Sequence, residues 1–373
     1  MVSRAPGVRG RTQLPPTLSF PNVANLHVMP SNSGATPGAA ASACASPHVL
    51  VIGEMLVEIM ADSLGEGFLE VQSFTGPYPS GAPAIFIDQV ARNGIGCSIV
   101  SAVGEDPFGR VLLDRLRTSG VDVSAVKTVP MLATGSAFVR YRASGDRDFV
   151  FNIVGSACAA IGDDADSRAA IERATHLHVM GSSLFSAVIA DLTLEAIAQI
   201  KGRGGTVSFD PNSRKEMLAI PGMRARLEQV LAATDLFLPS GPELMLFTER
   251  VDEAGAVDEL LARGVGAVVI KRGYAGASYY NRGGSVDVAP IPVAEVDPTG
   301  AGDSFSGTFV ACWLSGASPE WCLRMANASG ASAVSVRGPM EGNRTRAELE
   351  DRLALEGARH IAVTQTLETM HDH

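Results

Sequence analysis

Short apolar runs alternate with longer helical segments from His48 onward. The apolar runs have the length of buried strands, and we expect strands over about 48–53, 98–104, 176–180, 206–210, 235–239 and 267–271. The segments between them predict helices over about 82–94, 107–119, 186–201, 215–233, 253–264, 301–315 and 318–334. Strands that alternate with helices predict an α/β fold whose parallel sheet is covered on both faces. Ligands of such a fold bind beyond the carboxyl ends of the strands.

Two stretches break this alternation. Residues 67–79 and 134–152 have the composition of strands without an intervening helix. In the second stretch, Ser144, Gly145 and Asp146 form a turn signal between two alternating runs, which predicts a hairpin. Extra strands inserted in an α/β unit predict a small second sheet over the site.

The composition narrows the class of protein. The chain has 373 residues and 46% of them are hydrophobic, enough for one large α/β domain or two smaller ones. The net charge is −10 and no basic stripe is visible, so we expect no nucleic-acid partner. No apolar run reaches the ~18–20 residues of a membrane span. The cysteines form no CxxC pair and favour a reducing, cytoplasmic location without disulfides or zinc; they are Cys44, Cys97, Cys158, Cys312 and Cys322.

The first 46 residues differ from the rest of the chain. They are rich in Pro, Gly, Ser and Ala, and the first acidic residue is Glu54. We expect a disordered extension, or a start placed too far upstream, although a basic, acid-poor start also allows a transit peptide. The predicted domain spans 47–357, and 358–373 is a predicted C-terminal tail.

The run DPTGAGDSFSGTF, from Asp297 to Phe309, carries the clearest chemistry. Small residues at Gly300, Ala301 and Gly302 predict a helix start whose bare N–H groups can hold an anion. A carboxylate in the same turn would repel a phosphate, unless Asp303 faces the other reactant and accepts its proton. An anion cradle beside a base is what phosphoryl transfer to a hydroxyl needs. A bare GAGD suits close helix packing and a capping Asp equally well, so these residues alone leave both interpretations open.

The whole string resembles the C-terminal signature D-x-x-G-A-G-D of the ribokinase (PfkB) family of carbohydrate kinases. The resemblance covers about residues 48–340. It implies a three-layer α/β/α sandwich with a mostly parallel central sheet. It also implies a β-lid, formed by about 55–79 and 134–153, that covers the sugar and often makes a homodimer contact. The implied reaction is ATP-dependent phosphorylation of a sugar, with the GAGD amides as an anion hole and Asp303 as general base.

Several residues are expected to bind the sugar. The family usually has an acid at the position of Glu58, which accepts hydrogen bonds from sugar hydroxyls. PSGAPAIFIDQVARNG (79–94) resembles the family's Gly-Gly-x-x-x-Asn, and Gly81 would let the backbone approach the ligand. Ile85 stands where the family has a sugar-binding Asn, so we assign the missing polar group to Asp88, which is equally suited to a surface position. In FDPNSRKEM (209–217), Asn212 and Arg214 follow a strand and are expected to reach substrate or phosphate.

The resemblance also implies residues that bind ATP and cations. KRGYAGA (271–277) is similar to the family's nucleotide-facing K-x-G-x-x-G. In PSGPEL (239–244), Glu243 matches the acid that the family uses with Mg²⁺ through water, whereas Ser240 replaces an Asn. Asp297 and Thr299 resemble a loop that binds a monovalent cation, such as K⁺, in some members. The residues assigned to the nucleotide are Lys271, Gly273, Gly276 and Asn327.

Two substrates fit the resemblance, and the pattern is closest to the tagatose kinase and 2-keto-3-deoxygluconate kinase branches. The acid sugar needs a cation, and in that branch a Tyr-Tyr-Arg run precedes Gly-Ser-Ala. Here the run is Phe151-Asn152-Ile153, without Arg, which favours a neutral ketohexose such as tagatose or fructose. Arg140 and Arg142 on a neighbouring strand are candidates to replace the missing cation. The substitutions at the family's motifs also leave open a non-catalytic sugar-binding or regulatory protein on the same fold.

Overall fold

A large central sheet forms the middle layer of the protein. The computed structural model describes residues 46–213 and 218–356. The strands pair in parallel except for an antiparallel edge formed by the last two in the chain. Their spatial order is β13 (Gly284–Val288), β12 (Ala277–Asn281), β11 (Ala267–Lys271), β10 (Leu236–Phe237), β9 (Thr206–Asp210), β8 (His176–Met180), β1 (His48–Ile52), β4 (Gly96–Gly104) and β5 (Val126–Val129).

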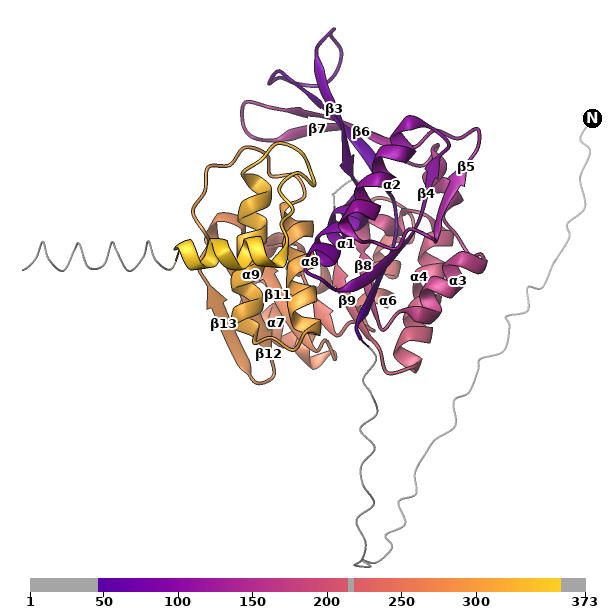
Figure 1. Ribbon diagram of the computed structural model, residues 1–373. Coiled ribbons are helices and arrows are strands. Elements are labelled where there is room, and N and C mark those ends of the chain that lie inside the picture. Colours follow the sequence, from indigo (N-terminus) through magenta and orange to yellow (C-terminus); the bar gives the residue numbers. More distant parts are fainter. Residues whose placement is uncertain (1–45, 214–217, 357–373) are drawn as a thin grey trace, which may run out of the picture. The chain divides into compact units, whose positions relative to one another are not determined.

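Helices cover both faces of this sheet, as Figure 1 shows. Successive side chains of a strand point to opposite faces of the sheet, so the protein has one hydrophobic core on each face. In β1, Val49 and Val51 belong to the first core, and Leu50 and Ile52 belong to the second. The first core includes α1 (Ala82–Arg92), α2 (Pro107–Ser119), α8 (Ala301–Leu314) and α9 (Pro319–Val334). The second includes α3 (Ala165–Arg173), α4 (Ala187–Gly202), α6 (Met223–Leu231) and α7 (Glu253–Ala262). The predicted three-layer α/β/α sandwich is therefore confirmed.

A smaller sheet is built from two separate parts of the chain. Its order is β3 (Phe74–Ser80), β2 (Leu56–Ala61), β6 (Gly135–Tyr141) and β7 (Arg147–Asn152). The hairpin between β6 and β7 turns where the sequence predicts it, with Gly145 at a φ of 88°. In Figure 1 its strands extend beyond the helical layers. We call this small sheet the β-lid.

Some predicted elements are shorter than expected. The strand predicted over 67–79 begins only at Phe74, and residues 62–73 form a loop. Of the helix predicted over 215–233, residues 215–217 lie outside the described residues, and α6 begins after Gly222, where Pro221 and the left-handed Gly222 interrupt the backbone. The sequence prediction missed α3, β5, β12 and β13.

The extension before residue 46, residues 214–217 with the candidate Arg214, and the tail after residue 356 lie outside the described residues. Among the described helices, none has the length and apolar character to cross a bilayer.

Candidate active site

The first turn of α8 offers open backbone at the carboxyl edge of the sheet. Gly300 is the N-cap residue, in a left-handed conformation (φ 78°), and no side chain caps the helix. A Cβ at Gly300 would lie 2.4 Å from the carbonyl oxygen of Pro339, so the chain needs glycine there. At Gly302 a Cβ would meet nothing closer than the Lys271 Nζ at 3.7 Å. Gly302 is exposed and Ala301 is half-buried, so the first turn has room in front of Gly302 for an anion.

Asp303 lies in the same turn, and Asn212 fixes its position. The Asn212 amide Nδ2 donates to Asp303 Oδ1 across 2.9 Å. Asn212 follows β9 and has a positive φ of 39°, a conformation that Asn tolerates better than most residues. Its own N–H donates to Asp210 Oδ1 at 3.2 Å. The structure thus brings together two predicted residues, Asn212 and Asp303, that come from different elements.

Asp210 and Lys271 form a buried ion pair below this turn. The Lys271 ammonium contacts Asp210 Oδ2, and Ser306 Oγ donates to the same oxygen at 2.9 Å. Burial alone would lower the pKa of Lys271, but Asp210, with Glu243 and Asp303, raises it above its ordinary value. The ammonium of Lys271 thus faces a carboxylate, and its contact with the nucleotide stays a prediction. Asp210 was missed, although it is the strand-end acid of the motif that contains Asn212.

Glu243 lies beside this group, in the short helix η3 (Gly241–Phe247). Its two carboxylate oxygens accept hydrogen bonds from the backbone N–H groups of Ser213, at 2.6 Å, and Ser240, at 2.7 Å. Burial and the negative charge of Asp210 raise its pKa. Each oxygen keeps a second lone pair for a metal-bound water. Among the described residues no group of three acidic, His or Cys side chains could hold a metal.

Two buried carboxylates lie where β1 leads into the β-lid. Glu58, on β2, is 4% exposed and accepts a hydrogen bond from Ser80 Oγ at 3.1 Å. Glu54 accepts one from Ser183 Oγ at 2.7 Å. Gly81, the N-cap of α1, has a φ of 104°, and a Cβ there would lie 2.7 Å from the Glu54 carbonyl oxygen. The glycine thus brings the start of α1 against the backbone that carries Glu54.

Asp88 does not face a ligand site, which corrects its predicted role. The side chain is fully buried. Its carboxylate pairs with Arg92 at 3.0 Å and Arg115 at 3.1 Å, and it accepts from Asn343 Nδ2 at 2.7 Å. These contacts tie α1 to α2 and to the segment after α9. Ile85, one turn earlier, packs near Gly300, whose Cβ position is 3.3 Å from Ile85 Cδ1.

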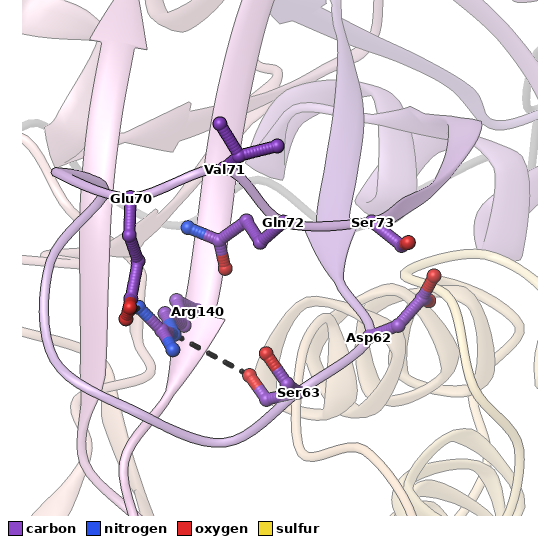
Figure 2. A pocket seen from close by; sticks show the side chains of 7 residues that line it. All are labelled: Asp62, Ser63, Glu70, Val71, Gln72, Ser73 and Arg140. Atoms are coloured by element: carbon purple, nitrogen blue, oxygen red, sulfur yellow. Dashed lines mark hydrogen bonds and ion pairs between the residues drawn. The ribbon is translucent and has the colours of Figure 1, made fainter.

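Arg140 is also occupied within the β-lid. Figure 2 shows its guanidinium enclosed by the loop that joins β2 and β3. It donates to backbone carbonyl oxygens, among them that of Gly67 at 3.0 Å, and pairs with Glu70 at 3.2 Å. The hollow in Figure 2, of about 390 Å³, has no lining residue from the first turn of α8. Arg140 therefore orders the lid loop, and its predicted contact with the sugar is corrected.

The loop before α8 contacts the β-lid through Asp297. One oxygen of this buried carboxylate accepts from the Tyr141 hydroxyl and from the Thr299 N–H at 2.9 Å, and the other accepts from the Gly338 N–H at 2.9 Å. Tyr141 Oη also lies 3.0 Å from Thr299 Oγ1. The structure thus brings the two predicted cation-loop residues together and links them to β6, through Tyr141, which the sequence analysis missed.

The predicted nucleotide residues lie around the antiparallel edge. Gly273 and Gly276 have φ values of 54° and 85°, and a Cβ at Gly276 would lie 2.2 Å from the carbonyl oxygen of Val288. Asn327, on α9, donates to the carbonyl oxygens of Val288 at 3.4 Å and Ala289 at 3.0 Å. Gly276 and Asn327 thus contact the end of β13 and the residue after it, whereas the binding of a nucleotide by Gly273, Gly276 and Asn327 stays a prediction.

Comparisons with known proteins identify the family. The model of the pfkB family of carbohydrate kinases matches residues 46–346. The chain therefore belongs to this family and is a carbohydrate kinase. It is similar to a 2-dehydro-3-deoxygluconokinase of Thermoproteus tenax, with 31% identity over 82% of this chain and 94% of that protein.

Two solved structures of similar proteins share the fold of this chain. One is an E. coli protein provisionally called Ribokinase II, in complex with ATP and Mg²⁺; it is 47% identical, with a TM-score of 0.77 over 82% of this chain and 98% of the other. The other is a fructokinase of Vibrio cholerae with fructose, ADP and potassium; it is 26% identical, with a TM-score of 0.70 over 82% and 98%.

Proposed function

We propose that this kinase transfers the γ-phosphoryl group of ATP to a hydroxyl of a neutral ketohexose, such as tagatose or fructose. The observation that carries the proposal is the placement of Asp303 in an uncapped first turn, with its carboxylate held by Asn212 at 2.9 Å. A fixed carboxylate beside open amides suits a base next to an anion cradle.

Asp303 accepts the hydroxyl proton while the sugar oxygen forms its bond to the γ-phosphorus. The bond between that phosphorus and the bridging oxygen breaks, and ADP leaves. The amides of Gly300, Ala301, Gly302 and Asp303 stabilise the charge on the transferred group. When bound, Mg²⁺ neutralises charge between the β- and γ-phosphates, and Glu243 is the residue that would hold it through water. Asp297 and Thr299 are the residues that would hold a monovalent cation.

The charge around the expected sugar site supports a neutral substrate. Glu54 and Glu58 are both buried near the start of α1, where they suit sugar hydroxyls and disfavour a sugar carboxylate. The two guanidinium groups considered as its partner are occupied: Arg140 in the lid loop, and Arg142 by Asp148. The similarity to a 2-dehydro-3-deoxygluconokinase keeps the acid sugar as the second candidate.

A coupled ADP-release assay tests the proposal. The panel contains tagatose, fructose, ribose and 2-keto-3-deoxygluconate, each with Mg²⁺–ATP and with KCl or NaCl. We expect kcat/KM to be highest for a ketohexose. A preference for the keto acid would replace the proposed substrate. Sugar binding without turnover on the whole panel would support the non-catalytic alternative.

A further inference from the structure

We propose that Lys271 and Asp210 are positioning residues for phosphoryl transfer, acting through Asn212 on the Asp303 carboxylate. The inference rests on the proposed function, because it concerns the group that we assign as general base. Neither residue is expected to touch the sugar.

A continuous set of contacts leads from the ammonium to the base. Lys271 pairs with Asp210 Oδ2, which Ser306 also binds, at 2.9 Å. The other oxygen of Asp210 accepts from the Asn212 N–H at 3.2 Å. Asn212 then donates its side-chain amide to Asp303 at 2.9 Å. Asp210 thus holds the backbone of Asn212, and the side chain of Asn212 holds the carboxylate of Asp303.

The backbone of Asn212 is the element that this pair would hold in place. Its φ of 39° is uncommon for a residue other than glycine, and such a conformation persists where its surroundings impose it. Asp210 lies two residues earlier, at the end of β9, and its carboxylate bonds the Asn212 N–H directly. Lys271 and Ser306 prevent that carboxylate from turning away, because both engage its second oxygen.

The positive charge of Lys271 also interacts with the acidic side chains around it. Asp210, Glu243 and Asp303 all act on its ammonium. A buried pair is weak evidence for stability, because desolvation offsets much of the attraction. Here the ammonium also lies 3.7 Å from the Cβ position of Gly302, under the turn that carries the base. The ammonium therefore offsets the repulsion between the carboxylates of Asp210, Glu243 and Asp303, which lie close together.

The test compares Lys271→Met with a matched lysine variant. We expect kcat to fall roughly 10–100-fold, the order of loss that follows from misplacing a reacting group. The KM for sugar should change less than about threefold, because the proposal gives Lys271 no contact with the sugar. Lys201→Met removes a lysine from another Lys–Asp pair, with Asp235 at 2.6 Å, which is partly exposed. That control should keep the wild-type kcat.

A double-mutant cycle separates positioning from general damage. Asn212→Gly removes the amide and accepts the positive φ. Because Lys271 acts through Asn212, adding Lys271→Met to Asn212→Gly should lower kcat by less than about threefold more, since contacting residues are not additive. A fully additive loss, or a wild-type kcat in Lys271→Met, would overturn the inference.

A second variant covers the case in which the single one does not fold. Lys271→Met with Asp210→Asn removes both charges, so no unpaired carboxylate stays buried. We expect this variant to fold and to show the same loss of kcat with little change in KM. A wild-type kcat in the folded double variant would refute the positioning role.

The proposed function and the positioning role can be refuted independently. A wild-type protein that turns over no sugar on the panel would refute that function alone. The Asn212 side-chain amide resonance, compared by NMR between wild type and the charge-free double variant, would still test positioning. An unshifted resonance would refute the inference.

Discussion

The side-chain amide of Asn212 lies 2.9 Å from Oδ1 of Asp303, although 91 residues separate them in the chain. The contact exists because β9 ends at the edge of the sheet where α8 begins. The carboxyl ends of parallel strands lie at the same edge of a sheet, so residues that follow different strands come close together there. Asn212 fixes the direction of the carboxylate, and the uncapped turn of α8 supplies the adjacent amides.

The first prediction concerns Asp303 itself. Asp303→Asn keeps the shape and removes the proton acceptor. We expect kcat to fall roughly 10²–10⁴-fold, the usual contribution of a general base, while the Kd for ATP stays near that of the wild type. Steady-state kinetics and calorimetry of ATP binding measure the two effects. Near-normal turnover would remove Asp303 from the mechanism.

The second prediction compares two glycines of the same turn. Gly302→Ala meets no protein atom within 3.7 Å, so folding should be unaffected or improved by up to about 1 kcal/mol, because Ala is the better helix former. The new methyl group would occupy the space assigned to the phosphoryl group. We therefore expect kcat to fall at least tenfold without loss of thermal stability.

Gly300→Ala provides the contrast. Its Cβ would lie 2.4 Å from a backbone oxygen, at a φ of 78°. We expect this variant to lose stability as well as activity, and thermal melts would show the difference. If Gly302→Ala retained full turnover, the amides of this turn would not bind the transferred group.

The sequence predicts the scaffold better than the contacts at the site. The bounds of α2 follow from local signals: Asp106 caps it, Pro107 occupies its first position, and Gly120 ends it. GAGD likewise predicts the open first turn of α8. These features depend on residues that are adjacent in the chain, so they can be predicted from the sequence.

The predictions that were wrong depended on residues far apart in the chain. Asp88 has a helical position suited to a ligand, but Arg115 and Asn343, from two other segments, surround it. Arg140 lies on a strand of the predicted lid, but the Gly67 carbonyl oxygen and the Glu70 carboxylate in the loop between β2 and β3 bind its guanidinium. The direction of a long charged side chain depends on the charge of its spatial neighbours, which one sequence does not reveal.

The third prediction concerns magnesium. In Glu243→Gln the amide NH₂ cannot accept the hydrogen bond that one carboxylate oxygen now receives from Ser213 or Ser240. We expect the Mg²⁺ concentration for half-maximal rate to rise about tenfold, the order of loss seen when a residue that holds a metal's ligand or bound water is replaced. Glu320→Gln, in the exposed first turn of α9, is the matched control. Equal Mg²⁺ titrations for both variants would argue against the role of Glu243.

The fourth prediction concerns the stability of the sheet in acid. His176 and His178 lie on β8, fully buried, and share Ser208 Oγ at 2.7 Å from each ring. Burial lowers the pKa of His176 to about 3. Burial, with the charges of His176 and Lys271, lowers the pKa of His178 well below its ordinary value. Both rings are therefore neutral in the folded protein at neutral pH.

The sign of the pH dependence follows from these pKa values. Unfolded histidine titrates near pH 6.5, so below that pH the unfolded chain binds more protons than the folded one. The full stabilisation is present above pH 6.5 and is lost progressively toward the folded pKa, by up to about 1.4 kcal/mol per pH unit for each histidine. Glu243, whose pKa is raised, acts in the opposite sense and reduces the slope.

Urea unfolding between pH 7.5 and 5.0 measures this effect, above the range in which most carboxylates titrate. We expect the free energy of unfolding to fall by roughly 4 kcal/mol in the wild type, from two histidines that each become protonated on unfolding. The His176→Gln/His178→Gln variant should lose at most half as much over the same range. His48→Gln, at a half-buried histidine on β1, should change the slope less. Equal slopes in the wild type and the double variant would show that these rings do not cause the acid sensitivity.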